Sequence, residues 1–391
     1  MALGKRFWVG VMGLATLALV GCGGGGSSSG GGSPAPGQLT FATTADIAGS
    51  YWVAYLRGES DSASVAPTPL AVSGWGDTTG DAAGTLLSSV FENDTTVVTG
   101  PTGSSSPYTV GSEGQFRILT AVGGSVVWEG GACGDGSAAL AATTGAVATV
   151  PAILVLARSL DGAFSNASLT GTWRGASFGV QPATPTPSFA IWASHTFDGA
   201  GSHTFSPGSV NSDGTVGPAG GGTAGYAVDG AGATPLTGFD GIATCRLCDG
   251  ARVLLGSSPS TAPTSFAGLR IYLPTGTGMS TASLNGPYWF VAMFGQRTTA
   301  GPGDIQALQG TCTFDGTGTA NLTGMIENVE SAIAARTDES LSYSVAGDGA
   351  ITAQGGAWTG QVGPDGKWAF LTGETSSGAD PFLMVLLRKS P

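Results

Sequence analysis

The sequence contains few charged residues and almost no histidine. Only 10% of its 391 residues are charged and two are histidine, so a Ser-His-Asp catalytic arrangement would have to use one of these two. Acidic residues outnumber basic ones by 26 to 14, which gives a formal net charge of −12. Nucleic acids and anionic lipid surfaces attract basic proteins, so this composition argues against electrostatic binding to either.

The sequence also lacks long stretches with the apolar spacing of an α-helix. Its 68 glycines and 21 prolines interrupt the chain throughout. Segments 115–120, 342–346 and 367–372 instead alternate apolar and polar residues, which indicates strands with one buried face. The best helical candidate is segment 324–339, for which a long hairpin arm is the other interpretation. The sequence therefore predicts an all-β protein.

A pattern of aromatic residues and turns occurs three times along the chain. Its centre is a tyrosine that precedes a turn glycine by six residues, at Tyr108, Tyr226 and Tyr343. Each copy opens on a Gly-x-aromatic segment, continues with a phenylalanine at a polar turn and ends in an apolar strand. The phenylalanines are Phe91, Phe197 and Phe314, and the closing strands are 152–158, 266–273 and 382–388. A repeat of about 115 residues predicts three similar small domains.

The turns within each copy favour antiparallel hairpins over helical crossovers. Asp-Gly pairs are typical of tight hairpin turns, so each copy is interpreted as a meander of about eight strands. Closure into a barrel protects the edges of such a meander. We therefore predict three tandem barrel-like domains, at residues 39–163, 164–278 and 279–391. The alternative is a six-bladed β-propeller built from half-repeats.

The closing strands of the first and third copies are apolar without alternation. A strand that is apolar on both faces is covered on both faces. The sequence therefore predicts that the three barrels pack against one another through these strands.

One opening strand carries a resemblance to known barrels. Leu169-Thr-Gly-Thr-Trp173 resembles the first strand of avidin-type and lipocalin-type barrels, in which Gly-x-Trp plugs the closed end. The resemblance implies an up-and-down barrel and says nothing of the ligand. The aromatic residues of the three opening strands are candidates to bind a ligand at a barrel mouth, and packing on the barrel floor is the other interpretation. They are Tyr51, Trp52, Trp173, Tyr288 and Trp289.

The N-terminus has the layout of a secretory signal over residues 1–21. A basic start, Lys5-Arg6, precedes an apolar core at 7–20. The following Leu19-Val-Gly-Cys22 resembles the lipobox of bacterial lipoproteins, which implies cleavage before Cys22 and acylation of its sulfur. Gly23 stands where an aspartate would mark inner-membrane retention, which favours the outer membrane. Residues 22–38 are interpreted as a flexible Gly/Ser/Pro-rich tether.

Four cysteines follow Cys22 in a chain that we expect to be exported to an oxidising compartment. Cys245 and Cys248 are candidates for a local disulfide, because no helical pattern supports a redox site and no second ligand pair supports zinc. Cys133 is interpreted as a buried thiol or as a partner of Cys312.

The two histidines flank a predicted turn. His195 and His203 are symmetric about Gly199, so they are expected to face each other across a hairpin. Together with Asp198 they are possible ligands of copper or zinc. The other two copies have no histidine at this place, and we expect no metal or other cofactor.

These observations predict a lipid-anchored protein of the cell envelope, most simply a non-enzymatic binding or structural module. Three copies of one unit suit multivalent contact. Beyond the membrane, the expected partners are a small ligand, a glycan or an envelope protein, and nucleic acid is not among them. One alternative is a barrel that binds a small ligand in its interior. Another is an extracytoplasmic hydrolase that uses carboxylates from the set Glu59, Asp61, Asp77 and Asp81.

Overall fold

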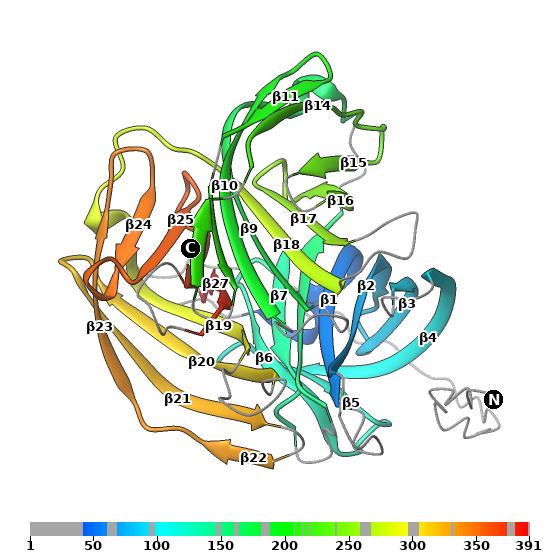
Figure 1. Ribbon diagram of the computed structural model, residues 1–391. Coiled ribbons are helices and arrows are strands. Elements are labelled where there is room, and N and C mark those ends of the chain that lie inside the picture. The colour runs from blue at the N-terminus through cyan, green and yellow to red at the C-terminus, as the bar shows by residue number, and fades with distance from the viewer. Residues whose placement is uncertain are drawn as a thin grey trace, which may run out of the picture. The chain divides into compact units, whose positions relative to one another are not determined.

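In the computed structural model of the protein, strands account for nearly all of the regular structure (Figure 1). The structure describes residues 42–60, 69–93, 98–145, 150–159, 164–180, 188–206, 208–212, 215–218, 220–238, 241–258, 267–295, 305–329, 332–373 and 380–389. The expected signal segment, Cys22 and the tether lie outside the described residues. All the contacts considered below fall within the compact unit Leu39–Pro391.

The first sheet is a closed barrel in which every strand pairs with its neighbours in chain order. The last strand returns to the first, with Tyr51 opposite Arg158. A short 3-10 helix, η1 (Thr44–Ile47), precedes it. The strands are β1 (Gly49–Ser60), β2 (Pro69–Gly80), β3 (Thr85–Asn93), β4 (Val98–Val110), β5 (Gln115–Leu119), β6 (Val126–Ala132), β7 (Ala138–Ala142) and β8 (Ala152–Arg158).

The third sheet closes in the same way, with one extra strand on its rim. The pairing of β20 with β21 completes the ring, and β22 (Ala332–Ala335) pairs with the outer end of β21. The helices are η3 (Thr281–Ser283) and η4 (Gln354–Gly356). The strands of the ring are β19 (Asn285–Gly295), β20 (Ile305–Asp315), β21 (Thr319–Val329), β23 (Glu339–Val345), β24 (Ala350–Ala353), β25 (Trp358–Val362), β26 (Trp368–Gly373) and β27 (Phe382–Arg388).

The second sheet follows the same path but is joined less completely. An isolated bridge between Tyr226 and Leu236 connects β14 to β15, and the hairpin β12–β13 branches off β10. The preceding helix is η2 (Asn166–Ser168). The strands are β9 (Thr170–Val180), β10 (Ser188–Asp198), β11 (Ser202–Phe205), β12 (Ser209–Ser212), β13 (Thr215–Pro218), β14 (Gly222–Gly225), β15 (Ala233–Gly238), β16 (Gly241–Cys248), β17 (Val253–Ser258) and β18 (Ala267–Pro274).

These sheets confirm the predicted all-β fold of tandem antiparallel barrels. The propeller alternative is wrong, because the strands of each copy form a ring instead of two separate radial blades. The helix considered for segment 324–339 is also wrong. There the chain forms the hairpin of β21 and β22 and then enters β23, as the hairpin-arm interpretation proposed.

The repeated tyrosine has the same structural role in all three barrels. Its hydroxyl donates to main-chain carbonyls at the 3-10 helix that precedes the first strand. The acceptors are Thr44 O for Tyr108 (2.9 Å), Leu169 O for Tyr226 (2.9 Å) and Leu284 O for Tyr343 (2.8 Å). Each bond joins residues that are 57 or more positions apart, so the tyrosine connects the middle of its repeat to the segment that precedes the first strand.

The phenylalanine of the repeat occupies equivalent positions in two of the three copies. Phe197 lies opposite Gly171 and Phe314 lies opposite Gly286, and both rings pack inside their barrels. The first barrel has Gly80 at the equivalent position, opposite Gly49. Phe91 instead stacks on Trp75 on the outer wall and is 37% exposed. The alignment of Phe91 with the other two was therefore wrong.

The described residues form four hydrophobic cores, one inside each barrel and one shared by all three. The closing strands β8, β18 and β27 supply both kinds of core. In β27, for example, Met384 and Leu386 face the interior of the barrel, whereas Val385 and Leu387 join the shared core. This alternation confirms that the barrels pack against one another through their closing strands.

The shared core has a cyclic order. The first two strands of each barrel pack on the last strands of another, namely β1–β2 on β17–β18, β9–β10 on β26–β27, and β19–β20 on β7–β8. Equivalent residues of the first strands make the outer contacts. Arg246 lies over the Trp52 ring at 5.3 Å, Arg174 binds Asp348 at 2.7 Å, and the Trp289 ring fills the space above Gly131.

A polar cluster joins the three barrels where their equivalent Asp-Gly turns meet. Lys367 Nζ lies 2.9 Å from Asp135 Oδ2 and 3.1 Å from Asp249 Oδ2, so it links the third barrel to the other two. Trp368 Nε1 donates to Asp249 Oδ2 at 2.9 Å. The side chains of Asp249 and Lys367 are 6% and 12% exposed, so these charges lie largely away from water.

Candidate functional site: a hydroxyl-lined groove on the second barrel

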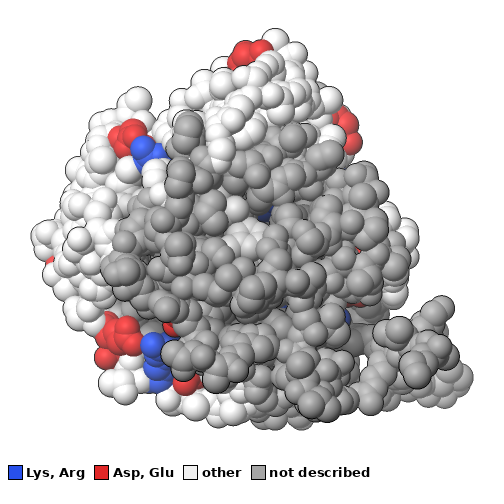
Figure 2. Space-filling model, in the orientation of Figure 1, with Lys and Arg blue, Asp and Glu red and all other residues white. Residues whose placement is uncertain are grey.

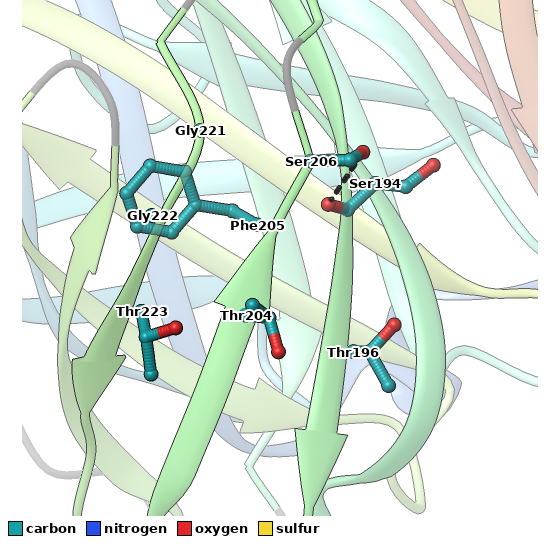
Figure 3. Close-up of a pocket in the computed structure, with 8 residues that line it drawn as sticks. All are labelled: Ser194, Thr196, Thr204, Phe205, Ser206, Gly221, Gly222 and Thr223. Carbon is teal, nitrogen blue, oxygen red and sulfur yellow. Dashed lines mark hydrogen bonds between the residues drawn. The ribbon is translucent and has the colours of Figure 1, made fainter.

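The third strand of the second barrel is interrupted. β10 pairs with β11 through residues 195–197 and with β12 through residues 189–192. At the break, Ser206 donates its main-chain N–H to Ser194 O at 2.9 Å. A groove of about 610 Å³ opens beside this break, within the usual range for small-ligand sites. Its lining residues are Ser194, Thr196, Thr204, Phe205, Ser206, Gly221, Gly222 and Thr223 (Figure 3).

Glycines allow the close approaches that shape the groove. A Cβ on Gly208 would overlap the carbonyl oxygen of Trp192, so the chain can approach β10 this closely before β12 only with glycine there. A Cβ on Gly222 would come within 2.9 Å of the Phe205 ring. The ring therefore lies against the bare backbone of β14, as Figure 3 shows.

The groove presents hydroxyl groups and no charge. Ser194, Thr196, Thr204, Ser206 and Thr223 provide five hydroxyls, and each can both donate and accept a hydrogen bond. The β-branched threonines have restricted χ1 angles on strands, which limits the directions of their hydroxyls before a ligand arrives. The Phe205 ring does not belong to this hydroxyl face, because Phe205 pairs directly with the inward-facing His195 and stacks on it. The hydroxyl face suits an uncharged ligand that itself carries many hydroxyls.

The two histidines lie on the inner side of the same wall. Their rings stack at 5.6 Å between centroids, which confirms that they face each other across the hairpin. Phe205 of the groove lies 5.8 Å from each of them, and Tyr272 approaches His195 at 5.0 Å. Burial lowers the pKa of His195 to about 3, and His203 and Arg270 add to the effect. His195 is therefore neutral at physiological pH and packs as one ring of an aromatic interior.

This arrangement offers no support for a metal between the histidines. Asp198 Oδ1 accepts the main-chain N–H groups of Ala200, Gly201 and Ser202 at 2.7–2.9 Å, so its carboxylate caps the turn instead of approaching the rings. Within the part of the chain that the structure describes, no three His, Cys, Asp or Glu residues are placed to hold a metal ion.

The aromatic candidates of the opening strands lie away from the groove. Tyr51, Trp173 and Tyr288 point into their barrels, and Tyr51 and Tyr288 donate to the carbonyls of Gly136 and Gly366. Trp52 and Trp289 point outward and are buried between barrels, each 6% exposed.

The groove residues do not stand out in the sequence. Their signal is a hydroxyl at alternate positions, in Ser194-x-Thr196 and again in Thr204-x-Ser206. In a chain this rich in serine and threonine, the same pattern also describes an ordinary solvated strand.

The disulfide expected between Cys245 and Cys248 is wrong for this fold. Both lie on β16, but Cys245 belongs to the interior core and Cys248 to the shared core, so they point to opposite faces of the sheet. Three residues along a strand span about 10 Å, whereas bridged cysteines have Cα atoms roughly 4.4–6.8 Å apart.

Cys133 and Cys312 fit the buried-thiol interpretation. Cys312 lies inside the third barrel, and Cys133 lies in the shared core and donates to Asp135 Oδ1 at 2.9 Å. The pairing considered for them is therefore wrong. Burial raises the pKa of Cys133 to about 11, so it is a poor thiolate nucleophile.

The acids considered for a hydrolase either have structural partners or lie outside the residues that the structure describes. Asp77 forms an ion pair with Arg246 of the second barrel, and Asp81 accepts the N–H of Thr85 at 2.7 Å. Asp61 and the side chain of Glu59 are outside the described residues. Charged side chains are also sparse on the described part of the face in Figure 2. The helices of the described chain have three or four residues, and none is long and apolar enough to cross a membrane.

No protein-family model and no curated protein matches the sequence. Among solved structures, the isotype 1 transferrin binding protein B of serogroup B Neisseria meningitidis is 9% identical, with 88% of this chain and 76% of that chain covered and a TM-score of 0.23. A double mutant of transferrin binding protein B from Haemophilus parasuis Hp5 is 8% identical, with 87% and 75% covered and a TM-score of 0.25. A DUF3598-family protein of unknown function from Nostoc punctiforme is 8% identical, with 57% and 97% covered and a TM-score of 0.18. At such TM-scores these similarities imply nothing about function.

Proposed function

We propose that this protein is a lipid-anchored, non-enzymatic module of the cell envelope whose second barrel binds a neutral carbohydrate. The observation that carries the proposal is the groove beside the broken third strand. It combines five hydroxyls with no charged lining residue. Sugars offer many hydroxyls, each of which can donate a hydrogen bond to these groups and accept one from them.

The chemistry of the groove favours this ligand class over others. An anionic ligand would find no basic group among the lining residues, and the chain as a whole carries a net charge of −12. A wholly apolar ligand would leave the hydroxyls without partners, which costs binding free energy. A ligand inside a barrel receives less support, because buried side chains pack each of the three interiors into a core.

The anchor and the domain division complete the proposal. Acylated Cys22 would hold the protein on the outer membrane, and tether 22–38 would separate domains 39–163, 164–278 and 279–391 from the lipid surface. Replacement of Cys22 by Ala should move the protein from the membrane fraction to the soluble fraction and abolish incorporation of labelled palmitate. Unchanged fractionation and labelling would contradict the anchor.

The groove is tested by calorimetric titration of the protein with maltose, cellobiose and lactose. We expect at least one of them to bind, and we expect Thr204→Val to weaken that binding tenfold or more, because the variant keeps the shape and loses one hydroxyl. The matched control is Asn321→Val, since Asn321 occupies the same position in the third barrel, opposite Thr313 as Thr204 lies opposite Thr196.

The control should bind as the wild type does, and both variants should keep the thermal stability of the wild type because both positions are exposed. The carbohydrate proposal fails if none of the three sugars binds. It also fails if Thr204→Val binds as tightly as the wild type.

A further inference from the structure

We infer that the carbohydrate is a linear, unbranched neutral polysaccharide that runs across the strands of the second barrel; this inference rests on the proposed function. The feature that carries it is a row of four exposed threonines, here called the threonine row. The row begins in the groove and continues beyond it. Its members are Thr172 on β9, Thr196 on β10, Thr204 on β11 and Thr223 on β14.

Strand pairing places the four residues in one line. Thr172 lies directly opposite Thr196, Thr196 opposite Thr204, and Thr204 opposite Thr223. Directly paired residues of neighbouring strands project from the same face of a sheet, so all four side chains are on the outer wall. Figure 3 shows three of them in sequence across β10, β11 and β14. The hydroxyls of Thr172 and Thr196 are 3.5 Å apart, so the row continues past the groove without a gap.

The regular spacing of the threonines along the row favours an extended ligand. Neighbouring strands are about 4.8 Å apart, so the row offers the same side chain at three successive intervals, over roughly 14 Å. This interval is comparable with the length of one hexose unit in a stretched glycan chain. A disaccharide would occupy the groove alone, whereas a longer chain would also reach Thr172, which is not part of the groove lining.

The surroundings of the row agree with a neutral chain. Each threonine presents a methyl group beside its hydroxyl, which matches the alternation of hydroxyls and C–H groups along a sugar chain. The adjacent outward positions on β10 are Ser194 and Asp198, and the Asp198 carboxylate already accepts three main-chain N–H groups of its turn. On β9 the outward residue next to Thr172 is Arg174, which already binds Asp348 at 2.7 Å and donates to Gln361 Oε1 at 3.1 Å, so these adjacent positions offer no unpaired cation to an anionic glycan.

The inference is tested by affinity as a function of chain length. Wild-type protein is titrated with malto- and cello-oligosaccharides of two, four and six units, and the six-unit sugar of the series that binds should bind at least tenfold more tightly than its two-unit sugar. The variant Thr172→Val should bind the two-unit sugar as the wild type does. Its increase in affinity from the two-unit to the six-unit sugar should fall to threefold or less. Thr313→Val, at the position of the third barrel equivalent to Thr196, is the control and should keep the full gain.

Each outcome separates this inference from the function on which it rests. A wild-type affinity that does not rise with length, or a gain that survives Thr172→Val, overturns the polysaccharide inference and leaves disaccharide binding intact. A Thr204→Val variant that binds all lengths normally overturns both. Sedimentation of wild-type protein as a dimer, with Thr172→Val as a monomer, would assign the row to a second copy of this chain and also overturn the inference.

Discussion

The second and third barrels share one strand order but differ in their third strand. In the third barrel, β21 pairs with β20 from Ala320 to Val329, with one irregularity near Gly310. In the second barrel, β11 and β12 share this role and leave a break between Phe205 and Ser209. The hairpin arms correspond as well, because β13 pairs with β12 as β22 pairs with β21.

The difference shows that the groove is a property of the backbone. The outward positions are polar in both barrels, with Thr196, Thr204 and Thr223 in one and Thr313, Asn321 and Ser340 in the other. Similar side chains thus line a groove in one barrel and a continuous sheet in the other. The break supplies the concave shape, and the hydroxyls supply the chemistry.

The largest effect is expected from removing a contact that joins the second and third barrels. Lys367→Met should lower the free energy of unfolding by about 3 kcal/mol, because it removes the buried cation at 3.1 Å from the Asp249 carboxylate and leaves only the exposed Arg252 at 3.8 Å. Urea denaturation measures the loss. Arg336→Met is the control, since its ion pair with Glu339 is exposed and should be worth less than about 1 kcal/mol. Equal losses in the two variants would contradict the importance of the polar cluster.

The second prediction is that the interiors of the second and third barrels differ in how they make stability depend on pH. The pKa of His195 is about 3 in the folded protein and about 6.5 in the unfolded chain, so the unfolded chain takes up the proton first as the pH falls. Stability should therefore decrease below pH 6.5, by about 1.4 kcal/mol per pH unit for this one group. His195→Phe keeps a ring at this position and should reduce that slope between pH 6.5 and 4.

The control for this pH effect comes from the third barrel. Cys312 occupies the position of His195 there, so Cys312→Val should leave the slope unchanged. Urea midpoints at pH 7, 6 and 5 provide the comparison. Parallel pH profiles for His195→Phe and the wild type would refute the assignment of the slope to His195.

The smallest expected effect tests how firmly each ring is closed. Tyr226→Phe and Tyr343→Phe should each cost about 1 kcal/mol, because each removes one buried hydroxyl that donates to a carbonyl. Among the described residues, the second barrel closes through an isolated bridge between Tyr226 and Leu236, whereas paired strands close the other two. Hydrogen exchange at the main-chain amides of this junction, in residues 226–227 and 236–237, should therefore accelerate in Tyr226→Phe. Amides as protected as in the wild type would show that the bridge does not depend on the tyrosine.

Much of the fold could be predicted from repeated residues. The tyrosine repeat marked a bond from the tyrosine hydroxyl to the 3-10 helix segment in all three barrels, because one geometric task requires the same residue at the same offset. The two-sided apolar closing strands predicted the shared core for an equally direct physical reason. The misaligned Phe91 shows the limit of this approach, since an aromatic residue near a polar turn looks the same on an inner and an outer wall.

The candidate site could not be predicted in the same way. The groove depends on where β11 ends, and that end is set by the glycine at 208 and by the pairing of β10 with β12, which joins positions as distant in sequence as Phe189 and Ser212. The Cys245–Cys248 prediction failed for a related reason. Spacing in the sequence suggested proximity, but alternation on a strand sends positions three apart to opposite faces.

The cyclic packing of the barrels has a consequence for assembly. Each barrel offers one surface to the barrel after it and a different surface to the barrel before it, which is a head-to-tail contact. Such contacts form open filaments unless the rotation between units closes a ring. Here the ring closes after three units, all within one polypeptide. The chain therefore satisfies both halves of every such contact internally, whereas a truncated chain with only two barrels would expose one half at each end and polymerise.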